Sequence, residues 1–300
     1  MTRCVAALLA ILAAAVPLRD SRGADPAPPA PFDSLLAWYR QTYSFISMDD
    51  TIYTFETEFR LPEGFHRPDS AALTGYQYWV SHLPLWNQWK PVGVWKGGKA
   101  YEYGEVSRVV HMPWRGTMYT DIGFPLRVFA EYCRYAGRES AMHIVTRADG
   151  DTLAYAAWLQ SKVSYTPLGG PRLVPATPRE ASEMEFYRFL TVAMEQQTYQ
   201  TLAANCDSLP PEEVRPGDLV IGHDDRLLVG KVYIVVNMLV NDEGERMYTV
   251  ATGCPKPNAC DLHIPLLTPD RHSPWITPGH LAALVDDLPQ WGFFRLRGSQ

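Results

Sequence analysis

Cysteine and histidine are the side chains of this sequence that could carry out nucleophilic chemistry. A thiol deprotonated by a neighbouring histidine can attack a carbonyl carbon, which is the chemistry of cysteine hydrolases. Cys133 and Cys206, the latter in LAANCDSL, are the thiols available for such a role. His223, in GHDDR, is a conceivable base because it has close acidic neighbours. The alternative interpretation of that segment is a solvated turn.

Two further cysteines, Cys254 and Cys260, lie close together in GCPKPNACDLH, with two prolines between them. The prolines favour a tight loop, and an exported chain can oxidise its thiols. The spacing therefore predicts a disulfide between the two residues. The alternative is a pair of isolated thiols, either of which is simply buried.

Sequence templates for metal, phosphate and serine chemistry are missing. The sequence has no HExxH, no CxxC, no EF-hand loop and no GxSxG elbow, and WKGGKA lacks the spacing of a phosphate-binding loop. The eight histidines are scattered along the chain. We therefore expect neither a metal ion nor a cofactor.

The first residues have the pattern of a secretory leader. Arg3 supplies a positive start, residues 5–16 form an apolar run and Pro17 breaks it, with small residues for cleavage near Gly23. The run is too short for a permanent transmembrane anchor. We expect residues 1–23 to be a signal peptide, residues 24–31 (ADPAPPAP) a Pro-rich linker, and the protein to be exported, either periplasmic or extracellular. A buried N-terminal helix is the alternative.

Charge argues against two classes of partner. The formal net charge is −6, and the leader holds more basic than acidic residues, so the remainder is more acidic still. A nucleic-acid-binding surface would be basic. No basic amphipathic stretch suggests binding to a membrane surface either. We expect no nucleic-acid partner.

The pattern of apolar residues predicts one α+β domain over residues 32–300, with helices packed on an antiparallel sheet. We expect a helix over residues 32–43 and a second helix that Pro84 ends. A third helix begins near Pro125 and ends before Gly137, and a long fourth helix runs from TPRE (177–180) to Leu202. The expected strands lie in 52–59, a hairpin over 90–112 around Gly97-Gly98, a strand and turn in 140–160, and 218–222, 231–237 and 246–252 with a turn at 241–244.

Aromatic residues are concentrated in one part of the chain. Five of the nine tryptophans fall between residues 79 and 114, interleaved with tyrosines. Aromatic rings can stack on sugars, which would suit a glycan of the cell envelope. A half-buried sheet covered by a helix needs the same residues for its core, and that is the alternative.

Several motifs together resemble a known bacterial family. EGFHRP, SAALTGYQYWVSHLPLW, VGVWKGGK, FAEYCRYAGRE, PGDLVIG and GKVYIVV occur in the order found in the family called domain of unknown function 4846. The closing HSPWI and LPQWGFFRL fit as well, so the similarity covers roughly residues 60–296. Each motif is weak alone, and their order carries the resemblance.

The family pattern also resembles the layout of NlpC-type, papain-like cysteine peptidases. There a cysteine at a helix N-terminus is held as thiolate by the helix dipole and by a histidine on a strand. Carried over to this chain, the cysteine position is Asp121, the histidine position is Lys231 and a family glutamine position is Thr252. The resemblance implies a degenerate site in which Asp121 and Lys231 form an ion pair. The alternative is local: Asp121 caps its helix and Lys231 reaches solvent.

Two functions follow as expectations. The first is an exported, non-catalytic module with a papain-like (NlpC-type) core that binds a cell-envelope glycan or envelope protein. The second is a cysteine hydrolase, a peptidoglycan peptidase or amidase, that uses a relocated nucleophile at Cys206 or Cys133 with His223 as base.

Overall fold

The computed structural model describes residues 32–43, 46, 52–86, 90–95, 97, 105–112, 116–146, 151–166, 170–256, 258–268 and 273–300. The expected signal peptide and linker lie outside these residues, as does part of the expected Gly97-Gly98 turn. Within the described segments, no helix combines the length and the apolar character needed to cross a bilayer.

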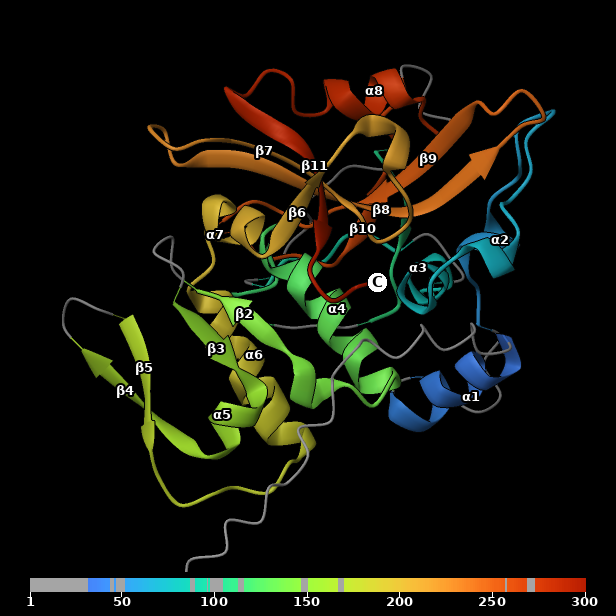
Figure 1. Cartoon of the computed structure of the whole chain (residues 1–300). Helices are drawn as coiled ribbons and strands as arrows, with labels where there is room; N and C mark the ends of the chain where they lie inside the picture. The colour runs from blue at the N-terminus through green and yellow to red at the C-terminus, as the bar shows by residue number, and fades with distance from the viewer. Residues whose placement is uncertain are drawn as a thin grey trace, which may run out of the picture.

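A five-stranded antiparallel sheet lies in the upper half of the molecule as drawn in Figure 1. Gly244, with a φ of +81°, lies in the turn between the strands over residues 229–240 and 246–251. In spatial order the strands are β6 (Cys206–Leu209), β11 (Gln290–Leu296), β7 (Leu219–Asp224), β8 (Val229–Val240) and β9 (Arg246–Ala251).

The two faces of this sheet bury different side chains because residues alternate along each strand. Ile221, Val232 and Ile234 belong to the large core on the helix-covered face. Val220 and Val235 belong to a smaller core on the opposite face, which α8 (Pro278–Ala283) covers. Figure 1 shows α8 on one side of the sheet and α4 and α6 on the other.

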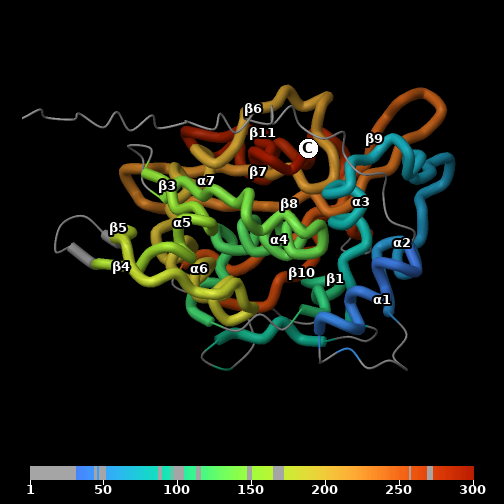
Figure 2. Tube along the Cα trace, turned by 60° about the horizontal axis from the view of Figure 1, so that its bottom comes forward, coloured from blue at the N-terminus to red at the C-terminus, as the bar shows by residue number. Residues whose placement is uncertain are grey.

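The helix α4 (Gly123–Tyr135) runs through the centre of the molecule in both views (Figures 1 and 2). Most residues of α4 are buried, and apolar side chains therefore occur on nearly every turn of the helix. The other helices are α1 (Phe32–Thr42), α2 (Phe55–Glu58), α3 (Gly75–Ser81), α5 (Tyr155–Leu159), α6 (Glu183–Glu195) and α7 (Tyr199–Ala204).

Three small antiparallel sheets surround this centre. They pair β1 (Val106–Val109) with β10 (His263–Pro265), β2 (His143–Val145) with β3 (Thr152–Ala154), and β4 (Ser161–Thr166) with β5 (Gly170–Pro175). Single 3-10 turns occupy η1 (Ser70–Ala72), η2 (Glu139–Ala141) and η3 (Pro211–Glu213). Helices packed on antiparallel sheets confirm the α+β class.

Most of the expected elements are confirmed, with the end of α3 before Pro84 and a left-handed Gly137 (φ +63°) after α4. The expected strand over residues 52–59 is wrong, because Phe55–Glu58 forms the helical turn α2. The side chain of Thr54 accepts a hydrogen bond from the N–H of Glu56, and Thr57 bonds back to Thr54, so a capping box outweighs the alternating pattern.

The expected long helix from TPRE to Leu202 is also wrong. Its first residues are not helical, and α6 begins only after Ser182, whose hydroxyl caps the N–H of Glu185. The chain then leaves the helix after Glu195, and Thr198 caps the separate helix α7. Two Ser/Thr caps thus divide what the apolar spacing presents as one helix.

The described ends of the expected hairpin over residues 90–112 pair elsewhere. Val94 forms a bridge with Cys260, and β1 pairs with β10. Both partners come from the segment that follows β9. The segment that contains Cys260 and β10 therefore pairs with residues on both sides of the stretch that the structure does not describe.

Candidate functional site

Asp121 lies in the tight turn that leads into α4. The helix starts at Gly123, and the residue in the N-cap position is Ile122, so the expectation that Asp121 caps the helix is wrong by one residue. Asp121 Oδ1 instead accepts a hydrogen bond from the N–H of Ile122 at 2.9 Å. The backbone N–H of Asp121 donates to the carbonyl of Cys254 at 2.9 Å, which ties this turn to the segment after β9.

The carboxyl group of Asp121 is enclosed, with the residue only 4% exposed. Burial raises the pKa of Asp121 to about 7, against the opposing effects of hydrogen bonds from Tyr199, Ile122 and Val232 and of the charge on Lys256. Lys256 donates its own hydrogen bond to the carbonyl of Gln197, between α6 and α7, at 2.8 Å. Burial thus outweighs every group that would favour the carboxylate.

The hydroxyl of Tyr199 explains how a protonated Asp121 is accommodated. Its oxygen lies 3.1 Å from Asp121 Oδ2 and 3.0 Å from the carbonyl oxygen of Gly230. One hydroxyl hydrogen cannot serve two acceptors at once. If Asp121 is protonated, its O–H donates to the Tyr199 oxygen, and Tyr199 donates to Gly230. The neutral acid therefore satisfies both contacts, and the carboxylate satisfies only one.

Lys231 does not meet Asp121, so the expected ion pair between them is wrong. Val232 bonds to the Asp121 carboxyl group and the carbonyl of Gly230 accepts from Tyr199, and the alternation of a strand directs the side chain of Lys231, between them, to the other face of the sheet. There the ammonium of Lys231 lies 3.0 Å from both carboxylate oxygens of Asp287. Both partners are largely exposed, so this ion pair contributes little stability.

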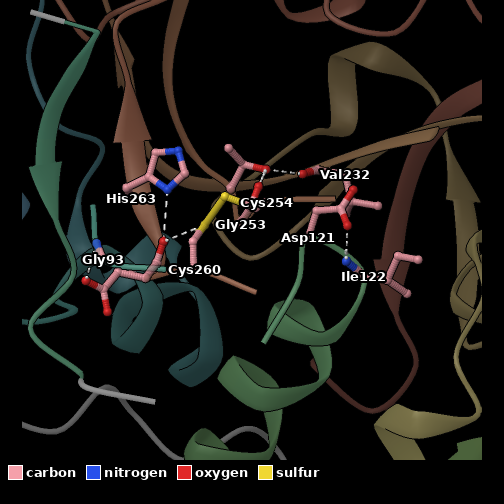
Figure 3. The surroundings of a disulfide bond; sticks show 10 residues. Gly93, Asp121, Ile122, Val232, Gly253, Cys254, Cys260 and His263 are labelled. Atoms are coloured by element: carbon pink, nitrogen blue, oxygen red, sulfur yellow. Dashed lines mark hydrogen bonds between the residues drawn. A yellow bond between two sulfur atoms is a disulfide. The ribbon is translucent and has the colours of Figure 1, made fainter. Parts of the chain in front are cut away.

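Thr252, at the third family position, does lie beside Asp121. Its hydroxyl donates a hydrogen bond of 2.7 Å to the carbonyl of Val232, and the N–H of Val232 bonds to the Asp121 carboxyl. The next residue, Gly253, packs so closely that a Cβ there would come within 2.9 Å of the Asp121 nitrogen. Figure 3 shows Asp121, Val232 and Gly253 together. Two of the three family positions are therefore neighbours.

A disulfide joins Cys254 and Cys260, whose Cα atoms are 5.6 Å apart (Figure 3). Both cysteines also bond to the turn before α4 through their backbones. The carbonyl of Cys254 accepts from Asp121, and the N–H of Cys260 donates to the carbonyl of Tyr119 at 3.2 Å. The cross-linked loop therefore holds the turn that carries Tyr119 and Asp121.

The remaining thiols are buried and unsuited to nucleophilic attack. Burial raises the pKa of Cys133 to about 12 and raises the pKa of Cys206 further. Cys206 Sγ donates to the carbonyl of Leu202 at 3.2 Å. His223 lies against Asp225, with Nδ1 2.7 Å from a carboxylate oxygen, and its ring stacks parallel to that of Tyr199. Within the described residues, neither thiol has a histidine as hydrogen-bond partner.

A polar and aromatic pocket of about 330 Å³ lies on the other side of the disulfide loop. Trp95 lines it and is half exposed, at 50%, whereas Trp79 is completely buried in the core. Tyr119 and Asp261 are among the other residues that line it. Asp261 Oδ2 accepts hydrogen bonds from the N–H of Gly93 (3.0 Å) and from the ammonium of Lys90 (3.1 Å), which fix the carboxylate in the pocket wall.

Sequence reasoning missed Asp261, Tyr119 and Lys90 as members of one site. Asp261 and its two donors are about 170 positions apart in the chain, and no local motif links them. The concentration of aromatic residues was the available signal, and it did not separate the buried Trp79 from the accessible Trp95. No cluster of three or more potential metal ligands occurs among the residues that the structure describes.

A family model described as domain of unknown function 4846 matches residues 55–296. No curated protein and no solved structure matches the chain.

Proposed function

Because this chain belongs to the family described as domain of unknown function 4846, we propose a function from its own residues: an exported, non-catalytic module that binds a cell-envelope glycan. The observation that carries the proposal is the pocket in which Trp95 is half exposed beside Tyr119 and the fixed carboxylate of Asp261. An aromatic ring packs on the apolar face of a sugar, and a carboxylate accepts hydrogen bonds from its hydroxyl groups.

The non-catalytic part of the proposal rests on Asp121. At the position where the family pattern has a cysteine, this chain has a buried acid whose raised pKa and Tyr199 contact favour the neutral form. A neutral carboxylic acid is a poor nucleophile. The histidine position, Lys231, faces away from it and pairs with Asp287. These contacts support a binding role over acyl transfer.

A degenerate papain-like core is supported by the order of the elements. A helix start with Asp121 is followed in the chain by antiparallel strands, and Asp121 packs against β8 with Thr252 beside it. That order and contact resemble the NlpC-type arrangement of nucleophile helix, histidine strand and third polar residue. Lys231, at the histidine position of that arrangement, departs from it because its side chain points to the opposite face of the sheet.

Export is supported by two separate features. The first 31 residues carry a short apolar run between Arg3 and Pro17, followed by a proline-rich tether. The Cys254–Cys260 disulfide suits an oxidising compartment such as the periplasm or the cell exterior.

Retention on purified peptidoglycan sacculi tests the binding function. The chain lacking residues 1–23 should sediment with sacculi, and Trp95→Ala should weaken the binding by about tenfold or more through loss of the stacking surface. Trp291→Ala is the matched control, because Trp291 is similarly exposed, at 45%, on β11. Equal retention of the two variants, or no retention of the parent chain, would overturn the proposal.

A further inference from the structure

A second pocket, of about 170 Å³, lies where α2 and α3 approach β8. It shares no lining residue with the Trp95 pocket. Its walls combine charged and amide side chains, Glu56, Arg67, His82 and Asn237, with the ring of Tyr78. Figure 1 shows α2 and α3 close to each other at the side of the molecule, away from α6 and α7.

His82 holds the carboxylate of Glu56 in this wall. The Nδ1 atom of the buried His82 lies 2.7 Å from the carbonyl oxygen of Tyr78, and Nε2 lies 2.9 Å from Glu56 Oε2. A carbonyl oxygen only accepts hydrogen bonds, so Nδ1 donates to Tyr78, and Nε2 holds the Glu56 carboxyl group. This hydrogen bond is the main cause that lowers the pKa of Glu56.

Glu56 itself remains available to a ligand, since 43% of its side chain is exposed whereas only 6% of the His82 side chain is. Because the two ring nitrogens of His82 are both engaged, this histidine is a positioning residue that keeps Glu56 charged and oriented. The pocket therefore presents a fixed negative charge.

Arg67 supplies a positive charge to the same pocket. Its Nη2 atom donates to the carbonyls of Phe55 and Glu56, at 3.0 and 2.8 Å, which fixes the guanidinium next to α2. The side chains of Arg67 and Glu56 form no ion pair with each other, although both residues are described. The two opposite charges thus stay separate in the wall and are not neutralised by direct contact.

Asn237 reaches the pocket because β8 has a bulge. The register of β8 against β9 shifts between Val235 and Asn237, so one extra residue is inserted there. Bulges commonly redirect a side chain next to a binding site. Asn237 is only 4% exposed, and its Oδ1 accepts from the N–H of Met238 at 2.8 Å. In the part of the chain that the structure describes, its Nδ2 has no hydrogen-bond partner, which leaves an amide donor at the pocket.

We propose that this pocket binds a small free α-amino acid as its zwitterion. The ammonium group of the ligand pairs with Glu56, and its carboxylate pairs with Arg67 and accepts from the Asn237 amide. Leu73 and the ring of Tyr78 cover the ligand side chain. The volume limits that side chain to a few carbon atoms. A neutral sugar would leave Arg67 without a counter-ion, and a simple anion would leave the Glu56 oxygen that His82 does not engage without a donor.

Titration of the full mature chain with alanine tests the proposal directly. Amide NMR spectra should show saturable shifts of the Asn237 side-chain amide, and His82 ring signals should move with them. N-acetylalanine lacks the ammonium group and alaninamide lacks the carboxylate. Each should bind about tenfold or more weakly than alanine, since each loses one of the two charge-assisted contacts. Both enantiomers of alanine are compared, because three fixed contacts define a handedness.

Substitutions test which residues hold the charged groups of the ligand. Glu56→Gln should abolish alanine binding, and Glu63→Gln, the same change at an exposed glutamate outside the pocket, should leave it unchanged. If Glu56→Gln lowers the stability of the fold, Asn237→Ala serves as a second test of the site. This variant should weaken alanine binding by about tenfold. Equal binding of alanine and N-acetylalanine, or shifts that map outside Asn237 and His82, would overturn the zwitterion site, as would an alanine titration without saturable shifts.

Discussion

Replacing Asp121 with asparagine should stabilise the protein at alkaline pH. The folded environment raises the pKa of Asp121 from 3.8 to about 7, mainly through burial. The native state therefore holds the proton more tightly than the unfolded chain does. Stability from this group is present below pH 3.8 and is lost as the pH rises to about 7. A difference of about three pKa units corresponds to about 4 kcal/mol at pH 8.

Asparagine imitates the protonated acid. Its amide N–H can donate to the Tyr199 oxygen while Tyr199 donates to Gly230, and its oxygen can still accept from the N–H of Ile122. We allow about 1 kcal/mol for imperfect replacement of these hydrogen bonds. The free energy of unfolding of Asp121→Asn should then exceed that of the parent by about 3 kcal/mol at pH 8 and match it within about 1 kcal/mol at pH 4.

Urea unfolding of both proteins from pH 4 to pH 8 measures this difference. Asp287→Asn is the matched control, because Asp287 is exposed and pairs with Lys231, and it should change stability by less than about 1 kcal/mol at either pH. A variant Asp121→Asn that is destabilised equally at pH 4 and pH 8 would refute the reasoning. That result would mean that the native state holds Asp121 as a carboxylate throughout.

Three further outcomes are expected. Gly253→Ala should lower the free energy of unfolding by about 1–3 kcal/mol, since the added Cβ meets an aromatic ring and a backbone nitrogen; unchanged urea unfolding would contradict this. Replacing Cys254 and Cys260 together by alanine should cost about 2 kcal/mol for so short a loop, and thermal unfolding of parent and variant measures it. In thiol titration Cys133 and Cys206 should react only after unfolding, because burial raises the pKa of both; one fast-reacting native thiol would favour a relocated nucleophile.

The spacing of apolar residues predicted the main helices and strands where no side-chain cap competed with it. The apolar runs in residues 218–222 and 231–237 and the turn at 241–244 predicted β7, β8 and the connection to β9. The errors occur where side-chain caps compete with that periodicity. Thr54 turns an alternating segment into α2, and Thr198 starts a new helix inside an uninterrupted apolar pattern.

The candidate sites were less predictable because their contacts are distant in sequence. Asp121 and Thr252, two of the positions that the resemblance singled out, both lie at the backbone of Val232. The resemblance could not decide the direction of Lys231, because a displacement of one residue along a strand moves a side chain to the other face. The Asn237 bulge adds one residue to β8, and no turn or charge in the sequence marks where it occurs.

The short turn before α4 connects the two halves of the proposed function. Tyr119 lines the Trp95 pocket, and Asp121, two residues later, is the residue that we align with the cysteine of NlpC-type peptidases. The disulfide loop bonds to both residues, through Cys260 to Tyr119 and through Cys254 to Asp121. A thiolate at position 121 would need a basic partner and access to solvent, whereas a neutral acid needs only the hydrogen bonds that already close the turn. Replacing a thiolate at position 121 by a neutral acid would therefore remove the nucleophile, while the wall of the Trp95 pocket stays in place.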